Sequence, residues 1–371
     1  MNKIIYLDAA ATALKPKVVI NKETDFLKND YANSGRGICP RVAAVDKMLL
    51  ETRKKVADFI GAETSNQVIF TSGATDGLNR IAQILKINKK IKNGTTVAVS
   101  DLDHHSARLP WEALIESGIN ILTMPLNDKY DFVLDEIPQA DVMIITAMSN
   151  VIGMPVDVRS VIQSARKKNP NVITVVDAAQ FVVHKKIDVK DWDADFVCFS
   201  AHKIGADTGL GIMYIKNPDD LLPDKFGGGM VNAVIDKDRF SINATPDKFE
   251  AGTLPITQIA GLGVAVEYIE KNRPDLNLIK YLYDELSKNS RIKIITQRDA
   301  TLLTFTIDGM HVLDFGALTG TAGVCLRVGN MCAGWIHNLL GINGSARISV
   351  GFWNTMEEMQ QVLDLINSIV K

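Results

Sequence analysis

Residues 194–216 read ADFVCFSAHKIGADTGLGIMYIK, and the fold expected for the whole chain follows from this stretch. The run at 196–199 is apolar on both faces, which is typical of a central strand in a sheet covered by helices. A second apolar run at 211–215 follows a glycine-bearing turn. Between the two runs lies Lys203, a residue type that is almost never fully buried unless it is paired. Lys203 therefore either points to water or is held where a desolvated amine is useful.

Short apolar, β-branched runs of the same kind alternate with helix-like stretches through residues 67–216. This alternation predicts an α/β domain with a mostly parallel sheet. Together with the two runs above, seven strands are expected, the other five being 67–70, 96–100, 120–124, 142–148 and 172–179.

The pattern changes in the C-terminal third of the chain. A loop-rich stretch at 223–253 precedes a long helix expected over 256–272, and shorter strands and helices then alternate to the end. This mixture indicates a smaller α+β domain. The predicted division is a large domain over 17–254 and a small domain over 255–371, to which the N-terminal segment 1–16 is assigned.

Composition and charge are those of an ordinary globular protein. The 371 residues include 41 Lys and Arg against 43 Asp and Glu, and 46% are hydrophobic. This balance argues against nucleic-acid binding through charge. Apolar runs free of charge stay shorter than the roughly 18 residues of a membrane helix, and the N-terminus lacks the apolar region of a signal peptide. We therefore expect a cytoplasmic protein that does not bind membranes.

Four cysteines occur, and their spacing matches no zinc-binding pattern, so no metal site is expected. So few cysteines in so long a chain disfavour a disulfide framework and indicate a reducing compartment. Cys198 and Cys325 lie inside strand patterns and are expected to pack as small hydrophobic residues. Cys332 follows a strand pattern, in a loop, and Cys39 lies near the N-terminus.

Polar residues that follow the predicted strands indicate a binding site, because ligands of open α/β sheets bind beyond the carboxyl ends of the strands. The first strand leads into TSGATDG at 71–77 and then a helix. Backbone N–H groups and hydroxyls at a helix start suit a phosphate, although Thr75 and its neighbours could equally be plain helix caps. His104 and Asn150 follow two further strands, where a structural histidine and a turn asparagine are the alternatives.

Asp177 leaves a strongly apolar strand, so its carboxylate needs a partner or its pKa rises; capping of the next segment is the alternative. Pyridoxal 5′-phosphate (PLP) requires an amine for a Schiff base, a carboxylate for the pyridine nitrogen, a flat group on the ring and anion donors. Lys203, Asp177, His104 and Thr75 supply these four in order, each from a different strand end. Each observation is weak alone, but together they predict PLP as the cofactor.

Seven motifs spread over the chain are similar to those of one enzyme family: TSGATDGLN, DLDHHSARLPW, SNVIG, VVDAAQ, FSAHKIGADTGLGIMYIK, FEAGT and RVGNMCA. They resemble aminotransferase class V, a group of fold-type I PLP enzymes, and more narrowly the group II, SufS-like cysteine desulfurases. The similarity runs nearly end to end. It implies a large domain with a mostly parallel seven-stranded sheet and a smaller C-terminal domain that carries a nucleophilic cysteine.

The resemblance implies roles around the cofactor. Lys203 would form the Schiff base and move protons once the substrate has replaced it, and Asp177 would pair with the pyridine N–H. Gln180 would reach the phenolic oxygen of the ring, and His104 would stack on its face. The phosphate would be held by the backbone of Ala74 and by Thr75, Ser200 and His202, with Thr253 reaching the phosphate of the other subunit in a homodimer.

The resemblance also implies how the substrate would bind and react. Asn150, Arg347 and Arg36 would bind L-cysteine, and Asn150 would also contact the cofactor. The planar guanidinium of Arg347 matches a carboxylate, and a surface charge on a strand is the alternative for that residue. Cys332 would attack the substrate sulfur as the thiolate, so that alanine leaves and a persulfide remains on the protein. A sulfur-acceptor protein, as in iron–sulfur cluster assembly, would then take the sulfur.

Five positions depart from the pattern of that family: Gly35, Cys39, Asn330 and Met331 stand where histidines are expected, and Asp207 stands where proline is expected. PLP binding is compatible with all of them. They leave open a class V enzyme with other chemistry, namely a selenocysteine lyase, aminotransferase, epimerase or β-lyase, or a non-catalytic sulfur-transfer scaffold. Cys39 is either a second thiol that relays sulfur or an inert packing residue, and packing is the favoured interpretation.

Overall fold

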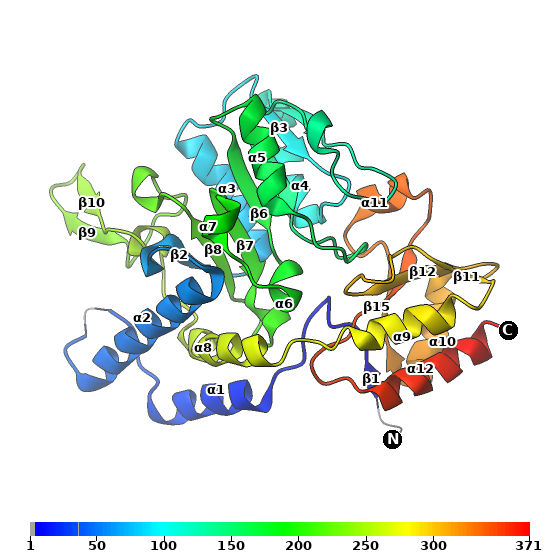
Figure 1. The fold of residues 1–371 in the computed structure, drawn as a ribbon. Helices are drawn as coiled ribbons and strands as arrows, with labels where there is room; N and C mark the ends of the chain where they lie inside the picture. Colours follow the sequence, from blue (N-terminus) through cyan, green and yellow to red (C-terminus); the bar gives the residue numbers. More distant parts are fainter. Residues whose placement is uncertain (1–3, 36) are drawn as a thin grey trace.

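Seven strands form the central sheet of the computed structural model, which describes residues 4–35 and 37–371 (Figure 1). Their order across the sheet is β2-β8-β7-β6-β5-β3-β4. β8 runs antiparallel to β2 and β7, and the other neighbouring pairs are parallel. All seven predicted strands are confirmed, with ends within about two residues of the prediction. They are β2 (Val68–Thr71), β3 (Thr96–Val99), β4 (Asn120–Thr123), β5 (Val142–Thr146), β6 (Ile173–Asp177), β7 (Phe196–Ser200) and β8 (Gly211–Ile215).

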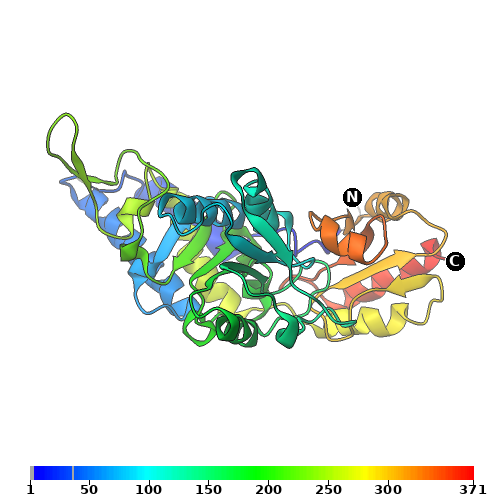
Figure 2. The same cartoon turned by 90° about the horizontal axis from the view of Figure 1, so that it is seen from above.

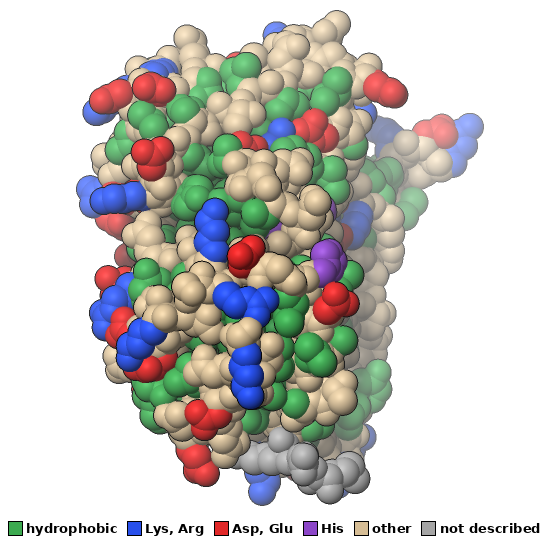
Figure 3. Space-filling model, turned by 90° about the vertical axis from the view of Figure 1, so that its right-hand side faces the viewer, with side chains coloured by type: hydrophobic (Ala, Val, Ile, Leu, Met, Phe, Trp, Pro, Cys, Tyr) green, Lys and Arg blue, Asp and Glu red, His purple; other side chains and the backbone are tan. Residues whose placement is uncertain are grey.

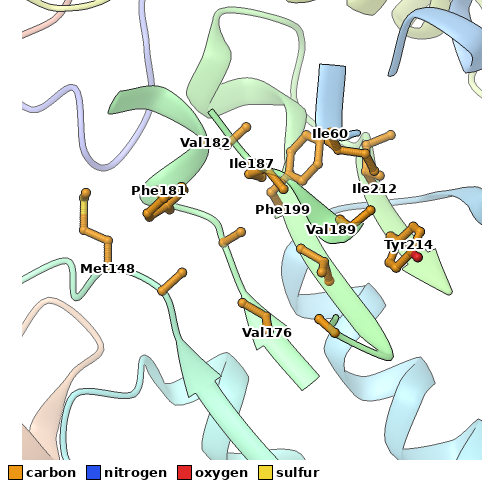
Figure 4. Packing of buried hydrophobic residues seen from close by; sticks show 14 of the residues in the cluster. Ile60, Met148, Val176, Phe181, Val182, Ile187, Val189, Phe199, Ile212 and Tyr214 are labelled. Carbon is orange, nitrogen blue, oxygen red and sulfur yellow. The ribbon is translucent and has the colours of Figure 1, made fainter. Parts of the chain in front are cut away.

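The central strand β7 is buried on both of its faces. Val197 and Phe199 pack into the core on one side of the sheet, and Phe196 and Cys198 pack into the core on the other, because successive side chains of a strand point to opposite faces. Figure 4 shows the first of these cores around Phe199. Cys198 is fully buried, as predicted for a packing residue, and burial raises the pKa of its thiol well above the ordinary value.

Helices cover both faces of this sheet (Figures 1 and 2). Residues of α2, α5 and α8 enter the core on one face, and residues of α3 and α4 enter the core on the other. The N-terminal helix α1 lies against α8. The helices are α1 (Lys17–Asn29), α2 (Pro40–Ile60), α3 (Ala74–Ile87), α4 (His105–Glu112), α5 (Val158–Lys168), α6 (Phe181–His184), α7 (Val189–Trp192) and α8 (Ile256–Lys271).

The C-terminal part builds a second sheet with the order β11-β12-β15-β14, all antiparallel. The N-terminal strand β1 pairs in parallel with β13, and Ile5 and Leu7 are buried in the core of this part. The division between residues 254 and 255 stays a prediction; α8 packs on α1 and α2, which favours a later boundary. The elements are β1 (Ile5–Tyr6), α9 (Asn277–Leu286), β11 (Ile292–Ile294), β12 (Leu303–Ile307), α10 (Val312–Thr321), β13 (Val324–Cys325), β14 (Arg327–Gly329), α11 (Gly334–Leu339), β15 (Ser345–Ile348) and α12 (Met356–Ile369).

The stretch predicted to be loop-rich contains a hairpin of two antiparallel strands, β9 (Val231–Val234) and β10 (Phe240–Ile242). It projects away from the rest of the molecule (Figures 1 and 2). Val234, Ile235 and Phe240 on the hairpin are exposed.

Charged side chains of both signs are interspersed over the face shown in Figure 3, in keeping with a net charge of −2. Within residues 4–35 and 37–371, the helices are all too short or too polar to cross a lipid bilayer.

Candidate active site

A cavity of about 330 Å³ lies at the carboxyl ends of β5, β6 and β7, where the C-terminal part meets the large sheet. Its remaining walls come from the N-terminal segment, the starts of α3 and α4, and the β14 and β15 strands. Of the residues predicted for the site, Thr253 does not line this cavity, and Arg36 lies outside the described residues. Those that do line it are Ala74, Thr75, His104, Asn150, Asp177, Gln180, Ser200, His202, Lys203, Cys332 and Arg347.

Lys203 lies in the short helical turn η4 (Ala201–Ile204) that directly follows β7. Burial lowers the pKa of its ammonium to about 8, although the carboxylate of Asp177 acts in the opposite direction. Since an ordinary lysine has a pKa of about 10.4, Lys203 presents far more neutral amine near pH 7. A desolvated lysine of this kind is suited to act as a nucleophile toward a carbonyl group.

Asp177 is the last residue of β6 and is 5% exposed. One of its oxygens accepts a hydrogen bond from the backbone N–H of Ala179, at 2.9 Å. Burial raises the pKa of the carboxyl, while the Ala179 N–H and the charge of Lys203 counteract the shift. A carboxylate in this setting favours a cationic or N–H partner in the cavity.

The start of α3 forms an anion cradle. The helix is capped by Gly73, which has no side chain to occupy the first N–H groups, and the N–H of Ala74 donates to Oγ of Ser200 at 2.8 Å. A Cβ on Gly211 would lie 2.4 Å from Cα of Gly73, so only glycine lets β8 approach this helix start so closely. Open N–H groups at a helix N-terminus suit a phosphate.

The hydroxyl of Thr75 and the imidazole of His202 complete the cradle. Oγ1 of Thr75 donates to Oγ of Ser106 at 2.9 Å, so Thr75 is not the plain cap of α3 that sequence alone allowed. His202 shares a 3.0 Å hydrogen bond between its Nδ1 and Oγ1 of Thr12. Burial and the charge of Lys203 lower the pKa of His202 to about 4, so its ring is neutral at pH 7.

His104 caps the start of α4. Its Nδ1 accepts from the backbone N–H of Ser106 at 3.1 Å and lies 2.7 Å from the Ser106 hydroxyl. Burial and the nearby charge of Lys203 lower the pKa of His104 to about 4. The ring is therefore a neutral flat group at the cavity wall, as stacking on an aromatic ligand requires.

Arg347 of β15 is 2% exposed, so the alternative of a surface strand charge is wrong. Its Nη2 pairs with Oδ1 of Asp8 at 2.9 Å, and its Nη1 donates to the carbonyl of Asn150 at 2.9 Å. Asp8 also pairs through Oδ2 with Nη2 of Arg327, at 2.6 Å. Asp8 thus joins two arginines at the cavity, and neither Asp8 nor Arg327 was singled out from the sequence.

Three buried polar atoms at the cavity lack a hydrogen-bond partner among the residues that the structure describes: Oε1 of Gln180, Oδ1 of Asn150 and Nε of Arg347. Buried polar atoms nearly always have a partner. These three therefore indicate a polar ligand in the cavity. The free Nε of Arg347 leaves one side of its guanidinium open for a carboxylate.

Cys332 lies in the loop between β14 and α11, is exposed, and lines the same cavity. The loop is fixed by backbone contacts: the carbonyl of Met331 accepts from Nδ2 of Asn150 at 2.8 Å, and the carbonyl of Cys332 accepts from the N–H of His105 at 2.8 Å. The thiol is thus presented to the cavity by a short, anchored loop.

The remaining cysteines are placed differently. Cys325 is half-buried in β13, so it is less enclosed than predicted. Cys39 is exposed at the start of α2, so it does not pack inside this chain as expected. That its thiol is inert stays a prediction. Cys39 does not line the cavity that holds Cys332 within the described chain.

A lysine, a buried aspartate and a phosphate cradle at the strand ends of such a sheet define a fold-type I PLP-dependent enzyme. The model of the family described as Aminotransferase class-V matches residues 5–362, and the chain belongs to this family. Members of this family depend on PLP.

Cysteine desulfurases are among the relatives and solved structures that are similar to this chain over nearly its whole length. The chain is 31% identical to a "Probable cysteine desulfurase" of Vibrio cholerae, over 100% of this chain and 94% of that protein. It is 31% identical to a "Cysteine desulfurase" of Wigglesworthia glossinidia brevipalpis, over 99% and 92% of the two chains. The apo structure of the cysteine desulfurase from Thermococcus onnurineus NA1 superposes with a TM-score of 0.92 at 29% identity, covering 99% and 94%.

The residues present fit PLP on the structure's own terms. Gln180 offers the unpartnered acceptor Oε1 and Asp177 a buried carboxylate, while the start of α3, where Gly73 makes no side-chain cap, presents Ala74 and Thr75 to the cavity. Lys203 supplies the amine. In this order, these groups match the phenolic O–H, the pyridine nitrogen, the phosphate and the aldehyde of the cofactor.

Proposed function

We propose that the protein is a PLP-dependent cysteine desulfurase, which converts L-cysteine to L-alanine and keeps the sulfur as a persulfide on Cys332. The observation that carries this proposal is that Cys332, Lys203 and Arg347 line one cavity. An aminotransferase or epimerase would need the lysine and the arginine but has no use for a thiol at this place. The SufS-like subgroup remains part of the proposal, supported by the short loop that carries Cys332.

Bound PLP supplies an electron sink for the electrons released at the substrate's α-carbon. Lys203 would hold the cofactor and then, with its pKa lowered to about 8, accept and return a proton near pH 7. Asp177 would keep the pyridine nitrogen protonated, and the neutral ring of His104 would cover one face of the cofactor. Ala74, Thr75, Ser200 and His202 would orient the phosphate.

Arg347 would bind the substrate carboxylate on the side of its unpartnered Nε, since Asp8 and the Asn150 carbonyl take only one N–H each, from Nη2 and Nη1. Both anchors fix the guanidinium before the substrate arrives, which lowers the cost of ordering it. The unpartnered Oδ1 of Asn150 is an acceptor, so it would pair with an N–H or O–H of the ligand and not with the carboxylate.

The atoms that exchange bonds in the sulfur step belong to the chain and the substrate. The thiolate of Cys332 forms a bond to the substrate sulfur while the Cβ–S bond breaks, and the electron pair of that bond stays with the three-carbon fragment. Proton uptake then yields alanine, so no external oxidant is required. The exposure of Cys332 leaves the resulting persulfide accessible to a sulfur-acceptor protein, and we place the enzyme in the cytoplasm.

A homodimer is part of the proposal. Thr253 lines a separate hollow of about 540 Å³ with Arg53, Gly228 and Gly229, which is compatible with its serving the phosphate of a partner subunit. The exposed apolar residues of the β9–β10 hairpin support an interface in that part of the molecule.

The test is turnover of L-cysteine by the PLP-loaded protein, with alanine and sulfide measured together. We expect equal amounts of both in the presence of a reductant, and a loss of about 100-fold or more in Cys332→Ala. Cys39→Ala is the matched control, because that thiol is also exposed but lies outside the cavity. Alanine release that is unaffected in Cys332→Ala would sink the persulfide mechanism.

A further inference from the structure

The loop that carries Cys332 has an uncommon backbone. Met331 and Cys332 both adopt positive φ angles, 52° and 54°. Residues with a Cβ seldom occupy this left-handed region, and two in succession persist only where surrounding contacts hold them. The position of the thiol therefore depends on what anchors the loop.

His105, the first residue of α4, provides two of these anchors. Its backbone N–H donates to the carbonyl of Cys332 at 2.8 Å, and its ring Nε2 accepts from the backbone N–H of Gly334 at 3.1 Å. A Cβ on Gly334 would lie 3.4 Å from that Nε2, an ordinary van der Waals distance, so the ring lies directly against the backbone of Gly334. His105 thus binds the loop at two places, Cys332 and Gly334.

The same ring is itself held in place. It packs edge-on against Trp335, with centroids 5.4 Å apart at 90°. The guanidinium of Arg108 lies 4.2 Å from the Trp335 ring, and Arg108 is in turn paired with Asp101 and Glu112. α4 and the start of α11 therefore form one packed unit around His105.

We propose that His105 is a positioning residue for Cys332. The hydrogen bond from the Gly334 N–H to its ring fixes the thiol for attack on the substrate sulfur. The ring can accept this bond only as the neutral imidazole. This proposal rests on the proposed function for its kinetic consequence, but not for the contact itself. The preceding residue, His104, lines the cofactor cavity. Of these two adjacent residues, His104 would contact the ring of the cofactor and His105 would position the nucleophile.

The requirement for a neutral ring follows from hydrogen-bond chemistry. Nε2 accepts from an N–H, so it carries the lone pair and the ring proton is on Nδ1. Protonation would place an N–H against the Gly334 N–H and break the contact. Burial lowers the pKa of His105 below the ordinary value, which keeps the contact intact at neutral pH. The charged or titratable groups nearby are His104 and Arg108 on α4, and Cys332 in the loop.

The sign of the pH effect is fixed by the direction of this shift. The contact is fully present above the ordinary histidine pKa of about 6.5 and is lost as the pH falls through the lower pKa of the folded protein. As the pH falls below about 6.5, the rate of persulfide formation should therefore decrease because His105 becomes protonated.

The experiment compares His105→Ala with His105→Gln. Glutamine places an acceptor oxygen near the position of Nε2 but cannot titrate. In a single turnover without reductant, we expect alanine formation to slow by about 3- to 10-fold in His105→Ala, as for the loss of one neutral hydrogen bond. The L-cysteine concentration that half-shifts the cofactor's absorption band should stay unchanged. His105→Gln should restore the rate and lose only the part of the acid limb of the pH profile that belongs to His105, while the part due to Lys203 remains.

Amide hydrogen exchange of residues 331–335 gives a readout that needs no turnover. We expect faster exchange in His105→Ala and wild-type exchange in His105→Gln, in the PLP-loaded protein above pH 7. Unchanged rate and exchange in His105→Ala would overturn the proposal, as would a His105→Gln variant that behaves like His105→Ala. If the wild type forms no alanine, the proposed function fails, and the exchange measurement alone still decides on the contact.

Discussion

The lowered pKa of Lys203 predicts how the protein captures its cofactor. With a pKa of about 8, about one Lys203 side chain in eleven is neutral at pH 7. An ordinary lysine would be neutral in about one molecule in 2,500 at that pH. Since the neutral amine is the nucleophile, covalent PLP capture by the apoprotein should speed up about tenfold per pH unit and level off above pH 8 or so. The rate is followed by absorbance, with Lys203→Ala as the blank for non-covalent binding.

Asp177→Asn is the perturbation that tests the cause of this shift. Asp177 raises the pKa of Lys203 against the effect of burial, so its neutralisation should move the break in the rate profile to lower pH. Between about pH 8 and pH 10.4, Lys203 is protonated in the unfolded chain but neutral in the folded one. The free energy of unfolding of the wild-type apoprotein should therefore rise as the pH rises over that range. The reasoning would be refuted if the capture rate of the wild type levelled off only near pH 10, or if Asp177→Asn moved this levelling-off to higher pH.

Two further predictions concern buried arginines. Arg347→Lys should raise the KM for L-cysteine by about 10- to 100-fold with a smaller change in kcat, because a lysine cannot offer the same fork to a carboxylate; steady-state kinetics check this, and an unchanged KM would contradict it. Arg53→Ala should lower the free energy of unfolding by about 3–5 kcal/mol in a urea titration, because Arg53 and Glu250 form a pair with side chains 5% and 3% exposed. Its neighbour Lys54 pairs with Asp58, and their side chains are 70% and 63% exposed, so Lys54→Ala should lower the free energy of unfolding by less than about 1 kcal/mol. Equal losses of this free energy in the two variants would show that burial is not the cause.

The large sheet was predictable because each of its central strands is apolar on both faces. The β9–β10 hairpin was not, because its strands are short and largely exposed, and their residues carry no core pattern. The placement of α8 also escaped the sequence. Its apolar residues show that it is buried, but they do not show which layer covers it.

The cofactor residues could be placed from the sequence because the carboxyl ends of parallel strands meet at one edge of a sheet. Contacts that join distant segments could not. Asp8 meets Arg347 across 339 residues of sequence, and His105 meets Gly334 across 229. His105 stands in the motif DLDHHSARLPW, but its role and that of Asp8 depend on packing between the two parts of the molecule.

The central claim is that Cys332 receives the substrate's sulfur, and mass spectrometry of the protein after a single turnover tests it directly. The PLP-loaded enzyme is mixed with L-cysteine without reductant, trapped with an alkylating reagent and digested. We predict the added mass of one sulfur atom on the peptide that contains Cys332, in step with one alanine per active site, and none on the peptide that contains Cys39. Alanine formed without sulfur on Cys332 would contradict the account.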